Sequence, residues 1–161
     1  MRRGTIQVIC GEGNGKTAAA VGRAIVRSEH ERNIIMIPFL KGNQPLRSAF
    51  LKRLEPEFRI FSFERKEERY ESLMPGEQKE EAVNIQNSLN YARKVMCTGE
   101  CDVLILDEVL GLLGHGILSC GELESLLREK NEDMDLILTG RVFPDELTDC
   151  VDEITRVENE K

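Results

Sequence analysis

The chain has 161 residues, of which 40% are hydrophobic and 32% charged, and its formal net charge is −7. This length and balance are typical of one globular domain spanning residues 1–161, and they argue against a disordered or fibrous protein. Because acidic residues are in excess, any basic surface must be local. A nucleic-acid interface is therefore disfavoured, and small anionic ligands at one focused site are the better expectation.

The cysteines and the absence of apolar leader segments indicate the compartment. The sequence contains five cysteines, an odd number, and no run that resembles a secretory signal or a membrane span. We therefore expect reduced thiols in a cytoplasmic protein that does not contact membranes. Cys97 and Cys101 lie four residues apart, but no second pair or nearby histidine completes a zinc-type ligand set. We interpret them as ordinary thiols, and His30 and His115 as surface or loop residues.

Hydrophobic runs alternate with longer amphipathic stretches along the whole chain. This order predicts an α/β fold with a mostly parallel central sheet of about six strands and helices on both faces, in three layers, and the glycine loop at residues 10–18 makes it a fold of the P-loop, RecA-like kind. We expect strands at residues 5–10, 33–40, 57–61 (the weakest), 102–109, 134–141 and 153–157, and helices at residues 16–32, 76–96 and 119–130. In the second helix, the predicted buried side contains Ala82, Val83, Ile85, Leu89, Ala92 and Val95 or Met96.

The segment "CGEGNGKTA", residues 10–18, joins the first strand to the first helix. Glycines allow the backbone to curl so that several N–H groups point inward, and the helix N-terminus adds a partial positive charge. Lys16 would supply a mobile full charge, and the Thr17 hydroxyl is placed to bind a magnesium ion that bridges phosphate oxygens. The segment therefore predicts a phosphate-binding loop, although Cys10 stands where the strict G-x-x-x-x-G-K-[ST] pattern has its first glycine.

An acid that completes such a site is expected at the end of another strand. Asp107 and Glu108 follow the apolar run "VLIL". A carboxylate at the carboxyl edge of a parallel sheet faces the crevice in which ligands of open sheets bind. The loop and the acidic strand end therefore support each other as parts of one nucleotide site.

Five segments in one order resemble a known family. "CGEGNGKTA" resembles a loop of the type T-G-N-G-K-G-K-T-T, which also lacks the first glycine, and "IPFLKG" at residues 37–42 resembles Q-F-[IL]-K-G. "LILDEV", "LILTGR" and "LTDCVDEITRV" resemble an L-D-E segment, a T-G-R turn and L-A-D-x-V-[ST]-E-L-x-x-V. These are the motifs of the P-loop ATP:corrinoid adenosyltransferases that act on cob(I)alamin and cob(I)yrinic acid a,c-diamide. The resemblance runs nearly from end to end.

The resemblance implies a reaction in which Co(I) of the corrinoid attacks the 5′ carbon of ATP and expels triphosphate, in cobalamin biosynthesis or salvage. The loop would then bind the leaving triphosphate through Gly11, Glu12, Gly13, Asn14, Gly15, Lys16, Thr17 and Ala18. Thr17 and an acid would hold Mg²⁺ or Mn²⁺, with Glu108 the first choice and Asp107 the second. Lys41 and Arg141, at strand ends on the same edge, would reach phosphate or corrinoid groups, with solvated surface charge as the alternative.

The corrinoid side rests on "FSFE", residues 61–64, which resembles F-[ST]-W-E of the family. In an extended chain Phe61 and Phe63 project to the same side, so they would form an apolar wall beneath the corrin ring. The resemblance implies that such aromatics displace the lower axial ligand of cobalt, which makes Co(II) easier to reduce. We therefore count both rings with Lys16 as the catalytic groups.

The sequence departs from the family pattern at a few positions. Asn14 stands where the family often has lysine and Ala18 where it often has a second threonine, which removes one charge and one hydroxyl from the loop. The family usually continues past its last strand with a K-H-x-[FY]-x-x-G tail, whereas this sequence ends at "RVENEK". The resemblance also implies a homodimer and a flavin-type reductant or reductase as partner.

Two other functions remain open from the same residues. A P-loop small-molecule kinase would use the loop to bind the phosphates of ATP and would produce ADP. A non-catalytic nucleotide- or corrinoid-binding protein would bind without turnover, and the substitutions at Asn14 and Ala18 make it plausible.

Overall fold

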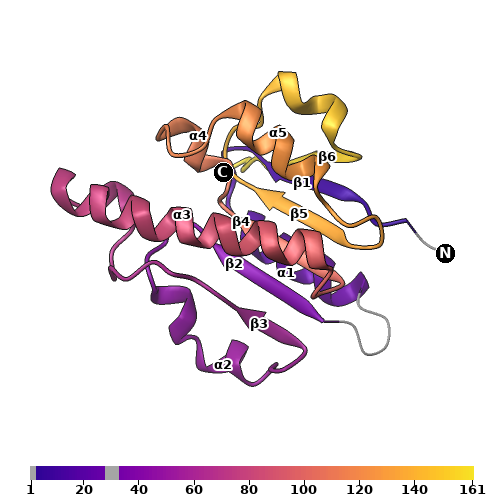
Figure 1. Cartoon of the computed structure of the whole chain (residues 1–161), viewed down its shortest axis with the longest axis horizontal. Helices are drawn as coiled ribbons and strands as arrows, with labels where there is room; N and C mark the ends of the chain where they lie inside the picture. The colour runs from indigo at the N-terminus through magenta and orange to yellow at the C-terminus, as the bar shows by residue number, and fades with distance from the viewer. Residues whose placement is uncertain (1–2, 28–32) are drawn as a thin grey trace.

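The protein is described here from a computed structural model, which covers residues 3–27 and 33–161. Six strands form one sheet, in the order β3-β2-β4-β5-β1-β6, and every neighbouring pair is parallel (Figure 1). This arrangement confirms the predicted parallel sheet. The strands are β1 (Ile6–Cys10), β2 (Ile34–Pro38), β3 (Phe58–Ile60), β4 (Val103–Asp107), β5 (Asp135–Thr139) and β6 (Glu153–Arg156).

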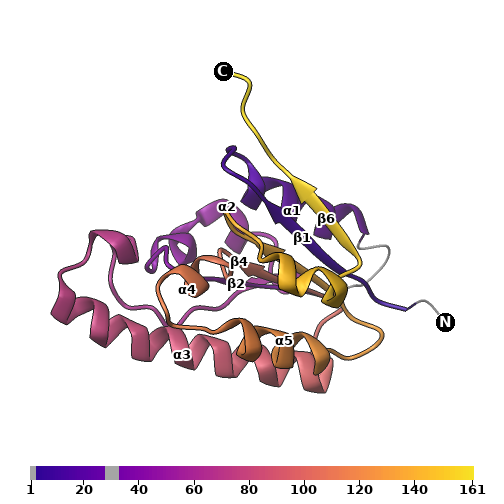
Figure 2. The same ribbon diagram turned by 90° about the horizontal axis from the view of Figure 1, so that it is seen from above.

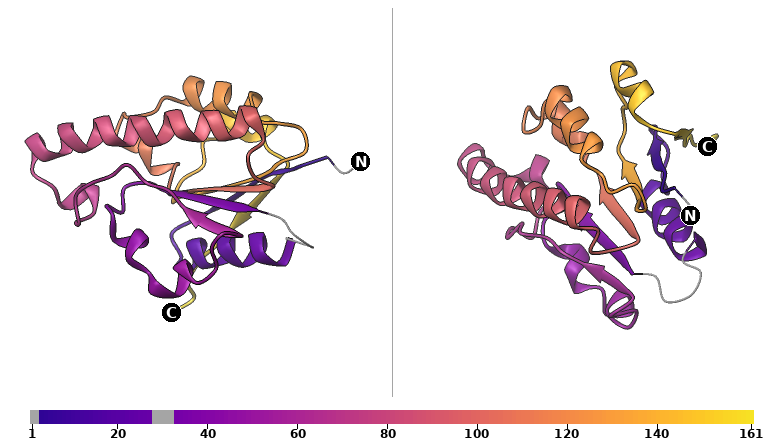
Figure 3. Two further views of the ribbon diagram at one scale, coloured as in Figure 1. Left: turned by 60° about the horizontal axis from the view of Figure 1, so that its bottom comes forward. Right: turned by 45° about the vertical axis from the view of Figure 1, so that its right-hand side comes forward.

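Helices cover both faces of the sheet, as predicted. In Figure 3, α1 and α2 lie on one face, and the long α3 lies with α5 on the other. The bounds are α1 (Lys16–Arg27), α2 (Ala49–Lys52), α3 (Pro75–Thr98), α4 (Gly111–Gly114) and α5 (Cys120–Arg128), with 3₁₀ turns η1 (Gln44–Arg47), η2 (Tyr70–Ser72) and η3 (Asp145–Cys150). The predicted extension of the first helix to residue 32, and with it His30, lies outside the described residues.

The hydrophobic core consists of two layers that the sheet separates. In β2, Ile35 and Ile37 contact the cluster beneath α3 and α5, whereas Ile34 and Met36 contact the cluster beneath α1. Strands buried on both faces read as continuous apolar runs, which is why β1, β2, β4 and β5 could be recognised in the sequence. Within the described residues, no helix has the length and apolar character needed to cross a membrane.

The buried side of α3 differs from the prediction at one position. Val83 is 62% exposed and Ala82 is partly buried, whereas Ile85, Leu89, Ala92, Val95 and Met96 face the core. The reason is helical geometry, since two residues of separation place Val83 about 200° around the helix from Ile85. Glu81, four residues before Ile85, is the buried side chain instead, at 1% exposed.

Caps define the ends of these helices. Gly99 ends α3 in the left-handed conformation, which glycine adopts readily. The Ser119 hydroxyl accepts a hydrogen bond from the backbone N–H of Glu122 and so caps α5.

The sheet order determines which loops meet. Because all strands are parallel, their carboxyl ends lie at one edge of the sheet, where the loops after β1, β2, β3, β4 and β5 gather. Strand β5 separates β1 from β4, so the end of β5 lies between the phosphate-loop strand and the acidic strand. Figure 2 shows the segment after β6 continuing beside the loop that joins β1 to α1.

Candidate active site

The loop after β1 is packed on one side and open on the other. The N–H of Gly13 donates to the carbonyl of Val157, and a Cβ on Gly11 or Gly13 would lie 2.4 to 2.8 Å from backbone atoms of residues 157–158. A Cβ on Gly15, by contrast, would meet nothing within 4 Å. The first two glycines therefore admit the chain segment after β6, and the third keeps the mouth of the loop open for a ligand.

Lys16 and Thr17 occupy the first turn of α1. The Lys16 ammonium folds back over the loop and donates to the carbonyl of Gly13, with Nζ and O 2.6 Å apart. The Thr17 hydroxyl donates to the carboxylate of Asp107, with Oγ1 and Oδ1 2.9 Å apart. The helix N-terminus, one ammonium and one hydroxyl thus converge at the open mouth, where they suit an anionic ligand.

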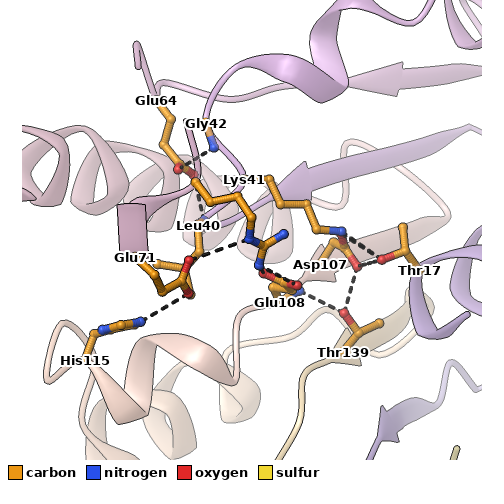
Figure 4. A network of polar contacts seen from close by, with 11 residues as sticks. Thr17, Leu40, Lys41, Gly42, Glu64, Glu71, Asp107, Glu108, His115 and Thr139 are labelled. Carbon is orange, nitrogen blue, oxygen red and sulfur yellow. Dashed lines mark hydrogen bonds and ion pairs between the residues drawn. The ribbon is translucent and has the colours of Figure 1, made fainter. Parts of the chain in front are cut away.

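Asp107 is the centre of a buried polar network at the end of β4 (Figure 4). Its side chain is fully buried and accepts hydrogen bonds from the hydroxyls of Thr17 and Thr139, the latter at 2.7 Å. The ammonium of Lys41 forms an ion pair with the same carboxylate and also lies 2.8 Å from the Thr17 hydroxyl. The loop after β2, the end of β5 and the start of α1 are therefore fixed on one carboxylate at the end of β4.

Glu108 points elsewhere. Its carboxylate accepts two hydrogen bonds from the guanidinium of Arg69, at 2.8 and 3.1 Å, and its backbone N–H donates to the Thr139 hydroxyl. The structure therefore places the second-choice acid, Asp107, against Thr17, and the first-choice acid against Arg69. Arg69 also approaches Glu71, so Glu108 belongs to a chain of ionic contacts along residues 69–71.

Backbone strain is concentrated at this edge. Among the described residues, Leu40 and Glu108 are the non-glycine positions with positive φ, at 67° and 59°. Leu40 precedes Lys41, and Glu108 follows Asp107. Such conformations cluster at functional sites, where the surrounding structure must hold them.

Donor chemistry at Thr17 and Asp107 fits a magnesium ion bound together with a nucleotide. One hydroxyl and one carboxylate are hard oxygen ligands, and Mg²⁺ in nucleotide sites takes few protein ligands and completes its shell with phosphate and water oxygens. No cluster of three or more His, Cys, Asp or Glu residues suited to a metal occurs in residues 3–27 and 33–161. Glu108, held by Arg69, is not aimed at this donor pair.

Arg141 lies beside the loop rather than over its mouth. Its guanidinium forms an ion pair with Glu12, at 2.7 Å, and both side chains are more than half exposed. The N–H of Asn14 donates to the side-chain oxygen of Asn159, at 3.2 Å, and Ala18 is exposed. An open cavity of about 690 Å³ lies between the loop, the T-G-R turn with residues 142–145, and the segment after β6.

The predicted corrinoid side follows β3. Phe61 and Phe63 both lie against Tyr91 of α3, with ring centroids 5.1 and 6.1 Å away, which fits the expectation that the two rings share a side. Phe63 is 46% exposed, so much of its ring is free to contact a ligand. The backbone N–H of Phe63 donates to the Ser88 hydroxyl on α3.

A buried carboxylate, Glu64, lies between the Lys41 turn and the aromatic segment. The Glu64 side chain accepts hydrogen bonds from the backbone N–H groups of Leu40 and Gly42 (Figure 4). Burial raises the pKa of the Glu64 carboxyl from 4.5 to about 7, the charges of Glu81 and Glu108 add to this rise, and the two amides oppose it.

Several residues of this edge were not predicted from the sequence. Thr139, Glu64, Arg69 and Glu81 all contribute polar contacts to it. Thr139 and Glu64 lie inside motifs that the sequence offered, "TGR" and "FSFE", whereas Arg69 lies in a charged loop without a pattern. Glu81 breaks an apolar helix face, and that interruption is the signal that could have identified it.

The chain is similar to several known proteins. The chain is similar to the "Corrinoid adenosyltransferase" of Escherichia coli K12, with 26% identity over 96% of this chain and 76% of that protein. It is similarly related to "Corrinoid adenosyltransferase CobA" of Salmonella typhimurium LT2, with 25% identity over the same shares. Among solved structures, domain III of the Thermotoga maritima replication initiation protein DnaA matches at 18% identity, with a TM-score of 0.43, over 98% of this chain and 55% of that chain.

The family model described as "ATP:corrinoid adenosyltransferase BtuR/CobO/CobP" matches residues 2–161, nearly the whole sequence. The glycine loop, the Lys41 turn, Asp107, the T-G-R turn and the Phe61 segment all lie within that match. The chain belongs to the ATP:corrinoid adenosyltransferase family.

Proposed function

We propose that this protein transfers the 5′-deoxyadenosyl group of ATP to the Co(I) centre of a corrinoid and releases triphosphate. The observation that carries the proposal is the placement, at the carboxyl edge of one sheet, of an open glycine loop after β1 and a half-exposed aromatic segment after β3. Family membership supports the ATP-dependent adenosylation of a corrinoid as the reaction. Cobalamin and cob(I)yrinic acid a,c-diamide are the substrates we propose.

The chemistry asks the protein to stabilise a leaving group rather than to activate a nucleophile. Co(I) provides the electron pair of the new cobalt–carbon bond, and the electrons of the broken C5′–O bond leave with the triphosphate. In this proposal, Lys16 and the backbone N–H groups from Gly15 onward, at the start of α1, stabilise the charge that develops on that triphosphate. The protein's other task is to hold the ribose carbon in line with cobalt.

Mg²⁺, or Mn²⁺ in its place, would bind through the Thr17 hydroxyl and the Asp107 carboxylate, and it would supply Lewis-acid stabilisation of phosphate charge. Lys41 already neutralises Asp107, so its ammonium and a metal ion compete for one carboxylate. We propose Asp107 rather than Glu108 as the metal ligand, because Glu108 is held by Arg69. Arg141 is proposed as a charge at the entrance to the cavity beside the loop.

Phe61 and Phe63 are proposed as the apolar wall beneath the corrin ring. An apolar surface supplies no axial donor to cobalt, so it favours a Co(II) state of lower coordination number that is easier to reduce. The partial exposure of Phe63 and the support of both rings by Tyr91 agree with this role. We further propose a homodimer, a flavin-type reductant and a cytoplasmic site of action.

One experiment separates this function from the kinase and from the non-catalytic binding protein. The purified protein is given ATP, Mg²⁺ and chemically reduced cobalamin, and the cobalt spectrum and the phosphate products are followed. Adenosylcobalamin with an equal amount of triphosphate is the expected result. ADP as the product would favour a kinase, and binding of both substrates without turnover would favour the non-catalytic binding protein.

A further inference from the structure

Glu64 lies between the two substrate segments and uses both of its carboxylate oxygens in the same turn. Oε2 accepts from the N–H of Leu40, at 3.1 Å, and Oε1 accepts from the N–H of Gly42, at 3.2 Å. These two amides flank Lys41. The side chain is only 3% exposed, so water does not compete effectively for either contact.

The turn that Glu64 holds is one that the chain rarely adopts unaided. Leu40 and Gly42 both have left-handed backbone conformations, with φ of 67° and 66°. Glycine tolerates this conformation, but leucine adopts it only where neighbouring contacts enforce it. A Cβ on Gly42 would lie 2.5 to 2.9 Å from the carbonyl oxygens of residues 66–68, so the turn is packed directly on the chain that follows Glu64.

The direction of the Lys41 side chain depends on this turn. Lys41 extends from it to the Thr17 hydroxyl and to Asp107, at the mouth of the phosphate loop. On the other side of Glu64, the N–H of Phe63 is bound to the Ser88 hydroxyl of α3. A single carboxylate therefore connects the lysine of the nucleotide side to the aromatic segment of the corrinoid side.

A second buried carboxylate fixes the same loop without touching the Lys41 turn. Glu81 of α3 accepts from the N–H groups of Arg65 and Lys66, at 2.9 and 2.8 Å, and from the side chain of Asn84. It thus anchors the loop to the helix. Glu81 provides a matched control, because it is as deeply buried as Glu64 and bonds to the neighbouring residues of the loop.

We propose that Glu64 is a positioning residue that fixes the Leu40–Gly42 turn, so that Lys41 is held ready for the triphosphate of ATP and its position is tied to that of Phe63. This inference rests on the proposed function, in which Lys41 contacts the triphosphate. Because Glu64 acts through Lys41, substituting Glu64 should not reduce the affinity for ATP any further in a variant that already lacks the Lys41 side chain.

A double-mutant cycle measured by calorimetry tests this coupling without adenosyl transfer. The affinity for ATP with Mg²⁺ is compared in the native protein, Glu64→Gln, Lys41→Ala and the double variant. In Glu64→Gln an amide N–H₂ faces one of the backbone donors, so the turn loses a contact. We expect about a tenfold loss of affinity from Glu64→Gln in the native background, and less than about twofold in the Lys41→Ala background. Glu81→Gln should change the affinity less than about twofold.

Equal losses in both backgrounds, or no loss in the native one, would overturn the proposal. If the native protein does not bind ATP at all, the proposed function and this inference fail together. Native binding with additive losses overturns the inference alone.

A titration of the native protein provides a second measurement in case Glu64→Gln does not fold. The charged groups that act on Glu64 are Glu81 of α3 and Glu108 after β4. As the carboxylate gains a proton it becomes a poorer acceptor, so ATP affinity should fall below about pH 7 in the native protein more steeply than in Lys41→Ala. The amide resonances of Leu40 and Gly42 should shift together with the same midpoint. Independent midpoints, or parallel affinity profiles, would contradict the proposal.

Discussion

The two sides of this site are held by different kinds of contact. On the proposed nucleotide side, Thr17 lies in the first turn of α1, Asp107 and Thr139 are the last residues of β4 and β5, and Asp107 is fully buried. On the corrinoid side, residues 61–74 form a loop with one 3₁₀ turn, and its position depends on side chains that bind backbone amides. The sheet thus determines the first side, and a few buried carboxylates determine the second.

This difference has a functional meaning. Groups that stabilise a developing charge must be placed before the reaction begins, because reorganising them during the reaction would cost much of their benefit. A segment proposed to bind a large planar substrate has to leave part of its surface exposed, and the ring of Phe63 is 46% exposed. Substitutions on the nucleotide side should therefore reduce the transfer step itself, and those on the corrinoid side should act on binding or reduction.

Lys16→Ala should produce the largest effect. We expect a loss of about a thousandfold in adenosyl transfer with any reductant, because the leaving triphosphate loses its mobile positive charge. The measurement is the rate of adenosylcobalamin formation from preformed cob(I)alamin. Lys79→Ala, an exposed lysine on α3, provides the control and should transfer at the native rate. Full activity of Lys16→Ala would remove the loop from the mechanism.

Asp107→Asn should be next, at about a hundredfold, because the amide leaves Thr17 and Lys41 without their shared carboxylate. Glu108→Gln should reduce transfer less than about tenfold, since it removes an ion pair with the half-exposed Arg69. Both are compared by kcat/KM for ATP and by magnesium dependence, after a check that each variant unfolds cooperatively. If Glu108→Gln reduced transfer more than Asp107→Asn does, Glu108 would be the better candidate for the metal ligand, as the sequence first suggested.

The ranking of Asp107 and Glu108 shows which features of the site could be predicted from the sequence and which could not. The strands were recognisable because burial on both faces makes them apolar throughout, and the loop and "LDE" were recognisable because each ends such a strand. The orientation of adjacent side chains was not, because Glu108 has a left-handed backbone that turns its carboxylate toward Arg69. A pattern of residue types does not encode that single dihedral angle.

Contacts between segments that are distant in the chain could not be predicted from the sequence either. Thr139 joins the network because β5 lies between β1 and β4, which is a property of the sheet order. Gly11 and Gly13 were interpreted as phosphate-loop glycines, and their lack of a side chain also admits the segment after β6. Such roles depend on which elements become neighbours, so they could be assigned only once the topology was known.

Glu64→Gln should change the pH dependence of stability. The folded pKa of about 7 lies above the ordinary value of 4.5, so the native state holds this proton more tightly than the unfolded chain does. Its contribution to stability is complete below about pH 4.5 and is lost as the pH rises through 7. Between pH 5 and pH 8 the native protein should therefore lose about 2 kcal/mol relative to Glu64→Gln. Urea unfolding of both proteins across this range is the measurement, and parallel stability profiles would contradict the assignment.

Phe63→Ala should produce the smallest loss and the most selective one. We expect about a tenfold decrease in the rate of Co(II) reduction and less than a twofold decrease in transfer from preformed Co(I), because the ring acts on cobalt coordination rather than on ATP. The two rates are separated by supplying either a flavin reductant with cob(II)alamin or chemically reduced cob(I)alamin. Folding should be little affected, since the ring is 46% exposed.

Phe50→Ala is the matched control for this variant, because Phe50 is a phenylalanine on α2, 67% exposed and on the face of the sheet opposite α3. It should leave both rates unchanged. Equal losses of reduction and transfer in Phe63→Ala would mean that the ring only helps to bind the corrinoid. The aromatic segment would then contribute to corrinoid affinity alone. It would have no separate effect on the reduction of Co(II) to Co(I).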